Sequence, residues 1–141
     1  MRILMVCLGN ICRSPLAEGI LRQNLMNAGI TAKVDSAGTA SYHVDEPPDP
    51  RAVETGLKYG INISHQRARA FKQSDFNDFD LILAMDRENY RNIMAKASGP
   101  GDKSKVKLIG HWIDPVNMPD VPDPYYGGRD GFEKVYRMLD Q

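Results

Sequence analysis

The stretch Val6-Cys7-Leu8-Gly9-Asn10-Ile11-Cys12-Arg13-Ser14-Pro15 joins a short apolar run, residues 3–6, to a helical pattern that follows it. A strand, a tight loop and the start of a helix are therefore predicted to meet beside Cys7. The first N–H groups of a helix lack partners within the helix, and the helix dipole is positive there. This loop is predicted to hold an anion next to a nucleophile, Cys7, and a guanidinium, Arg13.

The residues around Cys7 suit such a loop. Gly9 and Asn10 adopt a positive φ more easily than other residues, as a tightly curled loop requires. Ser14 is expected to cap the following helix, and Pro15 fits its first turn, where no N–H is needed.

The rest of the chain alternates between strand and helix patterns. Further strands are predicted at 33–35, 81–85 and 106–109, and helices near 15–28, 50–59, 74–79, 87–97 and 132–139. Long polar loops are predicted at 39–50 and 110–127. The alternation predicts a three-layer α/β/α domain over residues 1–141, with a four-stranded parallel sheet of the Rossmann-like or flavodoxin-like type and ligands at the carboxyl ends of the strands.

Composition limits the possible partners. The chain has 141 residues, 18 Lys and Arg against 18 Asp and Glu, and two cysteines. A formal net charge of zero gives no overall field that would favour nucleic acid or an acidic membrane. No apolar run approaches the ~20 residues of a membrane span, and two cysteines without a secretory segment favour a reducing cytoplasm.

Cys7 is the central chemical group of the loop. A buried structural cysteine is the more common role for a free thiol, but a helix N-terminus and a nearby cation favour the reactive thiolate. Arg13 lies six positions further on, and its planar fork matches two oxygens of a phosphate. Nucleophile, backbone amides and guanidinium together suit attack on a phosphate monoester.

The pattern C-x5-R-S after the first strand resembles that of protein tyrosine phosphatases. The full loop sequence, Cys-Leu-Gly-Asn-Ile-Cys-Arg-Ser-Pro over residues 7–15, closely resembles that of the low-molecular-weight protein tyrosine phosphatase family. The resemblance extends over the whole chain, through Asp35-Ser36-Ala37-Gly38, Pro48-Asp49-Pro50-Arg51-Ala52, residues 79–86 and Asp123-Pro124-Tyr125-Tyr126. It implies a metal-independent, cofactor-free enzyme that hydrolyses phosphotyrosine in proteins, and small aryl phosphates, through a phosphocysteine intermediate.

The same resemblance selects the acid. The leaving oxygen must be protonated, and water must later be activated to release phosphate. Composition does not choose among the many aspartates, but the family match points to Asp123, with Asp86 and Asp120 as the alternatives.

Further residues receive roles from the resemblance alone. Leu8, Tyr42, Tyr125 and Tyr126 would contact the phenyl ring, although many relatives have tryptophan at the position of Tyr42. The loop would bind phosphate or inhibitory oxyanions through residues 8–14. A hydrogen-bond network that holds the loop would comprise Asn10, Ser14, Ser36 and His65, and Ser14 would also donate to the Cys7 sulfur.

Cys12 has two interpretations. The resemblance suggests a reversible disulfide with Cys7 that protects the nucleophile, whereas a small core residue is equally compatible with the sequence.

Other activities fit less well. Arsenate reductases with an internal thiol relay need cysteines after Cys12, and this chain has none. Protein arginine phosphatases of this fold resemble the pattern with Thr where Ile11 stands. A phosphocysteine carrier would not need Asp123, and no nucleotide P-loop or zinc-binding spacing occurs. The expected partners are tyrosine-phosphorylated proteins, bound by a cytoplasmic monomer with at most weak self-association.

Overall fold

A parallel sheet forms the centre of the computed structural model, which describes residues 1–124 and 129–139. Its strands are β1 (Arg2–Cys7), β2 (Lys33–Gly38), β3 (Leu81–Ala84) and β4 (Val106–Leu108). The four strands are all parallel, in the order β2-β1-β3-β4. The predicted four-stranded parallel sheet is confirmed.

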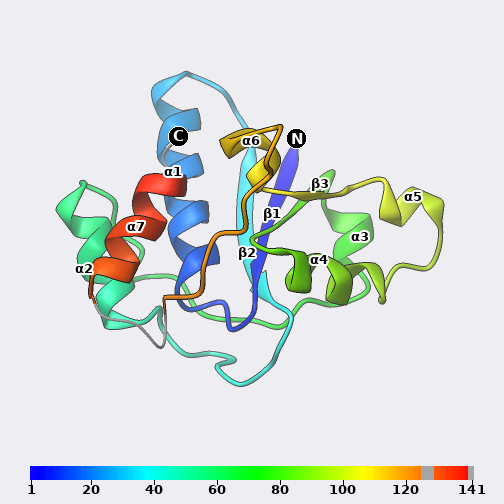
Figure 1. The fold of residues 1–141 in the computed structure, drawn as a ribbon, viewed down its shortest axis with the longest axis horizontal. Coiled ribbons are helices and arrows are strands. Elements are labelled where there is room, and N and C mark those ends of the chain that lie inside the picture. The colour runs from blue at the N-terminus through cyan, green and yellow to red at the C-terminus, as the bar shows by residue number, and fades with distance from the viewer. Residues whose placement is uncertain (125–128, 140–141) are drawn as a thin grey trace.

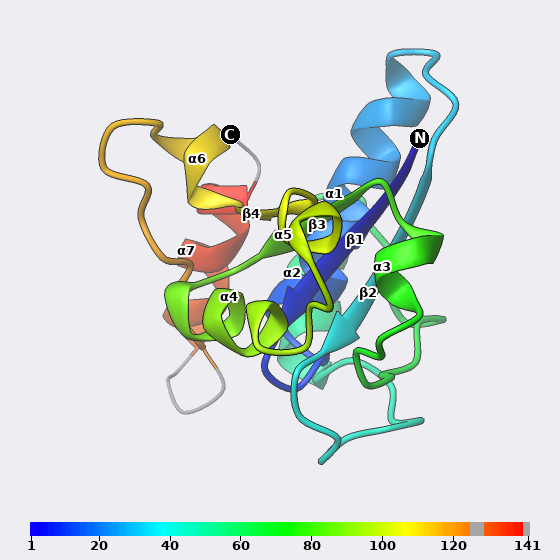
Figure 2. The same cartoon turned by 90° about the vertical axis from the view of Figure 1, so that its right-hand side faces the viewer.

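Helices cover both faces of this sheet, so the predicted three layers are present (Figure 1). On one side lie α1 (Arg13–Asn27), α2 (Pro50–Lys58) and α7 (Arg129–Leu139), which contact one another. On the other lie α3 (Asp75–Asp78), α4 (Arg87–Met94) and α5 (Pro100–Lys103), which face the viewer in Figure 2. A single-turn helix, α6 (Gly110–Ile113), follows β4.

The strands bury side chains on both faces, as a parallel sheet requires. In β1, Ile3 and Met5 pack into the core beneath α1 and α7, whereas Leu4 and Val6 pack into the second core beneath α3 and α4. The helix predicted near 132–139 is present as α7, and its residues Phe132, Val135, Tyr136 and Leu139, spaced at 0, 3, 4 and 7, are all buried in the first core.

Three details differ from the sequence-based expectations. Cys12, not Ser14, is the N-cap of α1, and Ser14 lies inside the helix. The helix predicted near 87–97 ends earlier, at Met94, and a separate single turn, α5, begins at Pro100, whose missing N–H costs nothing at the first helical position. The loop predicted over 110–127 begins with α6, a single turn that apolar periodicity is too short to reveal.

The strand order fixes where a ligand can bind. The chain leaves β1 toward β2 on one side of the sheet and later returns to add β3 on the other side of β1. A parallel sheet opens a crevice at such a reversal, beyond the carboxyl ends of the strands. Cys7 is the last residue of β1 and therefore lies at this crevice.

No helix within the described residues is long and apolar enough to cross a membrane.

Candidate active site

The loop after β1 curls around the Cys7 sulfur. Asn10 adopts the left-handed conformation, with φ of 58°, and its backbone N–H donates to Cys7 Sγ at 3.3 Å. Gly9 was expected to share the positive φ, but its φ lies outside the left-handed region. Its lack of a side chain matters for another reason, since a Cβ there would lie 3.0 Å from Cδ2 of His43.

Ser14 faces the nucleophile from the first turn of α1. Its Oγ lies 3.0 Å from Cys7 Sγ and accepts a hydrogen bond from Asn10 Nδ2 at 2.8 Å. These contacts explain why Ser14 does not cap the helix: its hydroxyl is directed back toward the loop. The expected contact between Ser14 and the sulfur is present, and its catalytic role stays a prediction.

Arg13 is held rigidly beneath the loop. Its Nη1 donates to Asp86 Oδ2 at 2.6 Å and to the Val121 carbonyl at 2.9 Å, and its side chain is only 3% exposed. Burial by itself lowers the pKa of Arg13. The nearby Cys7 sulfur and Asp86 carboxylate have the larger, opposite effect, so the pKa of Arg13 is raised above its ordinary value. Arg13 therefore remains a cation at the site.

Asp123 reaches the same pocket from the segment after α6. Its Oδ2 lies 3.7 Å from Arg13 Nη2, and its side chain is 32% exposed. The pocket, of about 60 Å³, is lined by Cys7, Leu8, Gly9, Ile11, Cys12, Arg13, Tyr42, His43 and Asp123. The structure thus brings together three side chains that are up to 116 positions apart in the chain, from Cys7 to Asp123.

The two alternative acids are placed differently. Both oxygens of Asp86 are engaged, one by Arg13 and the other by the backbone N–H of Asn89 at the start of α4. Asp120 pairs with Arg87 at 2.7 Å and is absent from the pocket lining. Their positions favour Asp123 as the group that can reach a leaving oxygen.

The pocket wall contains one residue that the sequence did not indicate. His43 lies beside Gly9, and its Nδ1 contacts Glu46 Oε2. Tyr42 lies at the rim and is 79% exposed, which leaves its ring available to a substrate. The positions of Tyr125 and Tyr126 lie outside the described residues.

The network predicted to hold the loop is only partly assembled as expected. Ser36 donates to Glu18 Oε1 at 2.8 Å, not to a residue of the loop. His65 is exposed, and no hydrogen bond connects it with the loop in the described part of the chain. Two nearby residues make the hydrogen bonds to this region instead. Gln66 donates to the Pro15 carbonyl at 3.2 Å, and the Arg69 N–H donates to Asn10 Oδ1 at 3.0 Å.

Cys12 is a buried free thiol, like Cys7. Burial is the main reason that the pKa of Cys12 is raised, and the negative charges of Asp49, Cys7 and Asp123 raise it further. Cys12 is thus held as a neutral thiol in the pocket wall. A disulfide with Cys7 stays a prediction.

Known proteins resemble this chain over nearly its full length. The family model described as "low molecular weight phosphotyrosine protein phosphatase" matches residues 2–141. A Schizosaccharomyces pombe protein with that name is 46% identical over 98% of this chain and 89% of its own.

Solved structures of other proteins share the fold. A protein tyrosine phosphatase from Entamoeba histolytica with Hepes in its active site has a TM-score of 0.93 at 37% identity, covering 99% of this chain and 90% of that one. Wzb of Vibrio vulnificus in complex with benzylphosphonate has a TM-score of 0.87 at 30% identity, covering 99% and 91%.

Proposed function

The chain belongs to the low molecular weight phosphotyrosine protein phosphatase family, and from this premise we propose that it hydrolyses phosphotyrosine in proteins, and small aryl phosphates, through a phosphocysteine intermediate. The observation that supports this most strongly is the common pocket of Cys7, Arg13 and Asp123. It combines a nucleophile, a phosphate-binding cation and a proton donor. The fold alone would not be sufficient, because many activities share it.

In the first step Cys7 Sγ attacks phosphorus as the bond between phosphorus and the phenolic oxygen breaks. Asp123 gives its proton to that oxygen, so tyrosine leaves as a neutral phenol. In the second step a water molecule gives a proton to the Asp123 carboxylate and attacks phosphorus. The P–S bond breaks, inorganic phosphate is released and Cys7 leaves as the thiolate.

Arg13 and the loop amides hold the phosphoryl oxygens in both steps. Nη1 of Arg13 is oriented by Asp86 and Val121, and this directs the Nη2 edge toward the pocket, where Asp123 lies. A fixed cation and fixed N–H groups stabilise the charge of the transition state without reorganising during the reaction. Metal-chelating agents should therefore leave the activity unchanged.

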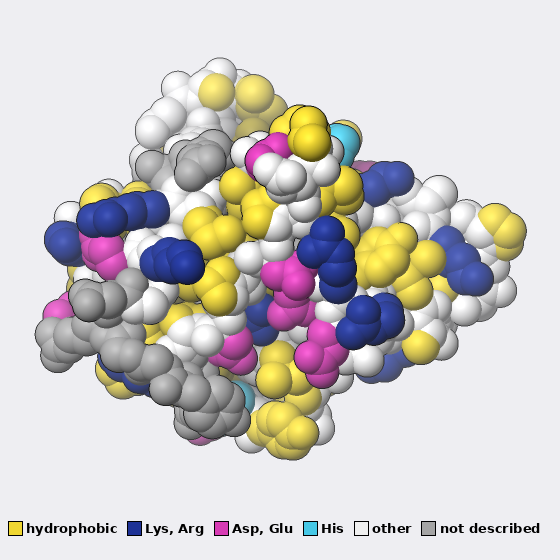
Figure 3. Space-filling view, in the orientation of Figure 1, with side chains coloured by type: hydrophobic (Ala, Val, Ile, Leu, Met, Phe, Trp, Pro, Cys, Tyr) yellow, Lys and Arg dark blue, Asp and Glu magenta, His cyan; other side chains and the backbone are white. Residues whose placement is uncertain are grey.

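The pocket rim supports an aromatic substrate. Leu8 and the exposed ring of Tyr42 would contact the phenyl group, and the family match extends the same proposal to Tyr125 and Tyr126. Positive and negative side chains are interspersed over the face seen in Figure 3, without a single large field of one sign. Recognition would then depend on the phosphorylated side chain and its immediate surroundings. Phosphate and related oxyanions should compete for the loop, as the benzylphosphonate and Hepes complexes of the relatives suggest.

We also propose a single domain over residues 1–141 that acts as a monomer in the cytoplasm. The family model spans residues 2–141, which supports one domain, and two free thiols suit a reducing compartment. Sedimentation across a concentration series would test the monomer and reveal weak self-association.

The direct test compares wild type with Cys7→Ser on p-nitrophenyl phosphate and on phosphotyrosine and phosphoarginine peptides. Loss of the nucleophile should lower kcat by about 10⁴-fold or more. Rapid quenching of wild type should trap a phosphocysteine. Persistent activity in the serine variant would refute the mechanism, preference for phosphoarginine would refute the substrate class, and transfer of the phosphoryl group to another protein without hydrolysis would indicate a carrier.

A further inference from the structure

Arg69 lies just outside the pocket, on a segment that extends the edge of the sheet. The Gly38 N–H donates to the Arg69 carbonyl at 2.8 Å, and the Phe71 N–H donates to the Gly38 carbonyl at 2.7 Å. These bonds form a parallel bridge between Gly38 and Ala70, directly after β2. The segment thus passes beside the loop that contains Cys7.

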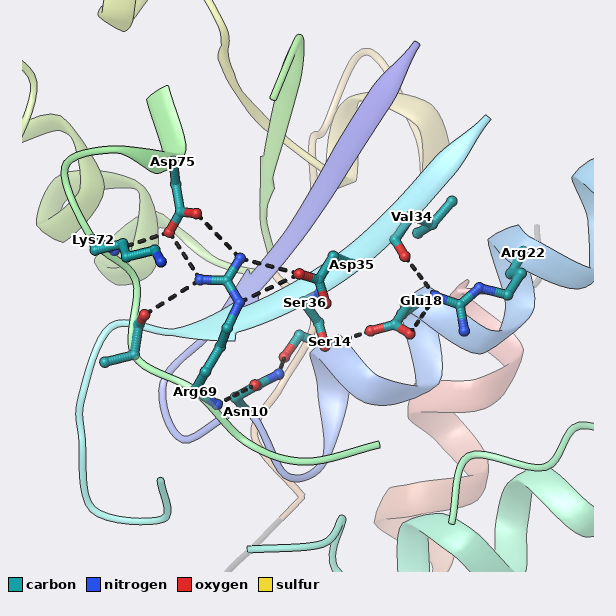
Figure 4. Close-up of polar contacts among 11 residues, drawn as sticks. Asn10, Ser14, Glu18, Arg22, Val34, Asp35, Ser36, Arg69, Lys72 and Asp75 are labelled. Atoms are coloured by element: carbon teal, nitrogen blue, oxygen red, sulfur yellow. Dashed lines mark hydrogen bonds and ion pairs between the residues drawn. The ribbon is translucent and has the colours of Figure 1, made fainter. Parts of the chain in front are cut away.

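The Arg69 guanidinium is held by two carboxylates (Figure 4). Nη1 and Nη2 donate to the two oxygens of Asp75 at 3.0 and 3.2 Å, and Nε and Nη2 donate to Asp35 Oδ2 at 3.3 and 3.2 Å. The Asp75 side chain is only 1% exposed and also accepts from the Lys72 N–H at 2.9 Å. A bidentate pair with a buried carboxylate has a defined geometry, unlike an exposed ion pair.

The backbone of the same residue directs a chain of hydrogen bonds to the nucleophile. The Arg69 N–H can only donate, so the atom of Asn10 that faces it, at 3.0 Å, must be the carbonyl oxygen. The amide nitrogen of Asn10 then faces Ser14 Oγ at 2.8 Å and donates to it. With its oxygen accepting that bond, the Ser14 hydroxyl can donate its own hydrogen to Cys7 Sγ, 3.0 Å away.

We propose that Arg69 is a positioning residue for the reaction. Its guanidinium, anchored by Asp35 and Asp75, fixes the N–H that orients the Asn10 amide, and this orientation makes the Ser14 hydroxyl a donor to the Cys7 sulfur. The proposal rests on the proposed function, because it takes Cys7 as the nucleophile. It adds three residues outside the pocket to the machinery that prepares the thiolate.

The consequence is specific to the chemical steps. A hydroxyl that donates to sulfur stabilises the thiolate before attack and again when it leaves the phosphocysteine. Substrate binding depends instead on Arg13 and the loop amides, which the Arg69 side chain does not contact in the described structure. Loss of the anchor should therefore lower kcat much more than it raises KM.

A matched pair of variants tests this. Arg69→Gln removes the guanidinium that both carboxylates bind. Arg67→Gln changes an exposed arginine of the same segment, whose side chain donates, among the described residues, only to the carbonyls of Ser64 and Gln66. We expect kcat on p-nitrophenyl phosphate to fall about tenfold in Arg69→Gln, the effect of one misaligned charge-assisted hydrogen bond. Arg67→Gln should match wild type, and Arg69→Lys should recover part of the loss.

A second readout does not depend on phosphatase activity. The rate at which iodoacetate alkylates Cys7, located by mass spectrometry and measured against pH, reports the thiolate directly. In Arg69→Gln the profile should move to higher pH, because the thiolate loses its donor. The other charged or titratable groups around the sulfur are unchanged in the variant: Arg13, Asp86, Asp123, Cys12 and His43.

A further variant, Asp35→Asn, distinguishes the proposed effect from misfolding. Arg69→Gln leaves the buried Asp75 without its cation and lowers stability, whereas Asp35→Asn replaces a carboxylate that is 40% exposed by an isosteric amide. Asp35→Asn should show a smaller shift in the same direction. Unchanged kcat and unchanged alkylation in folded Arg69→Gln and Asp35→Asn would overturn the proposal. The backbone bridge to Gly38 would then position the Arg69 N–H without help from the side chain. A failure of the proposed function would instead remove turnover in wild type and leave the alkylation comparison intact.

Discussion

Asp86 Oδ2 accepts a hydrogen bond from Arg13 Nη1 at 2.6 Å, although the two residues lie 73 positions apart. The other carboxylate oxygen accepts from the Asn89 N–H at 2.7 Å and so caps α4. One side chain therefore starts a helix on one face of the sheet and orients the phosphate-binding guanidinium at its edge.

These two functions of Asp86 can be separated by substitution. In Asp86→Asn an amide oxygen can still cap α4, but the charge that aligns Arg13 is lost. We expect kcat/KM to fall about 10- to 100-fold with little change in stability, because the Arg13 fork is free to turn. Asp86→Ala should lose a further ~1 kcal/mol of stability with the cap. Steady-state kinetics and urea unfolding of both variants provide the check, and full activity in Asp86→Asn would show that Val121 alone orients Arg13.

Asp123→Asn tests the proposed acid. The variant cannot protonate the leaving oxygen, so kcat should fall about 10²- to 10⁴-fold on substrates with poor leaving groups. The loss should be smaller for p-nitrophenyl and other activated phosphates, whose phenolate leaves without help. Kinetics across a series of aryl phosphates measures the difference. An equal loss throughout the series would remove the assignment of Asp123 as acid.

Gly38→Ala tests how closely β2 approaches the loop. A Cβ at this position would lie 2.8 Å from the Leu8 carbonyl oxygen and 3.1 Å from the Gly9 carbonyl carbon, both backbone atoms of the loop. The loop must move, and we expect a loss of ~1–3 kcal/mol in stability together with reduced kcat. Gly101→Ala is the control, since a Cβ there lies within 4 Å of no described atom beyond its chain neighbours and the backbone of its own helix, and α5 should gain stability. Thermal unfolding and steady-state kinetics of both variants measure these effects. Equal stability and equal kcat in Gly38→Ala and Gly101→Ala would contradict the prediction.

Glu18 gives the stability a defined pH dependence. Burial raises the pKa of Glu18 despite hydrogen bonds from Ser36 and the nearby Arg22, so the native state holds this proton more tightly than the unfolded chain. The contribution to stability is complete below the ordinary pKa of about 4.5 and is lost as the pH rises through the raised value. Glu18→Gln removes this dependence, so the variant should become more stable relative to wild type between pH 4 and pH 7. Urea unfolding midpoints of wild type and Glu18→Gln at pH 4 and pH 7 measure this change. If the difference between the two proteins were the same at both pH values, the native and unfolded states would bind the Glu18 proton equally.

Local sequence signals predicted the sheet and the reactive loop. Short continuous apolar runs such as residues 81–84 are typical of strands buried on both faces. The short spacing of Cys7 and Arg13 places both residues at one loop, independently of the rest of the chain. The helices near 87–97 and 132–139 were also predicted, because their patterns depend on neighbours within one or two turns.

Long-range pairings could not be predicted in this way. Nothing within a few residues of Arg69 indicates that its N–H would meet Asn10, and nothing near His65 indicates that it would stay exposed while Gln66 reaches Pro15. Ser14 was expected to cap α1 because it has the right residue type at nearly the right position. Its hydroxyl instead faces Cys7, a partner that only the curvature of the loop brings near.

The pairing of Arg13 with Asp86 and Val121 also has a consequence for refolding. In the folded protein these residues are held near Arg13 through the pairing of β3 with β1, because Met85 N–H donates to the Val6 carbonyl and Val121 N–H to the Met85 carbonyl. Such contacts between distant segments form late, after the local helices. Recovery of phosphatase activity during refolding should therefore lag behind the far-ultraviolet circular dichroism signal, and a partly folded chain that is rich in helix should be inactive.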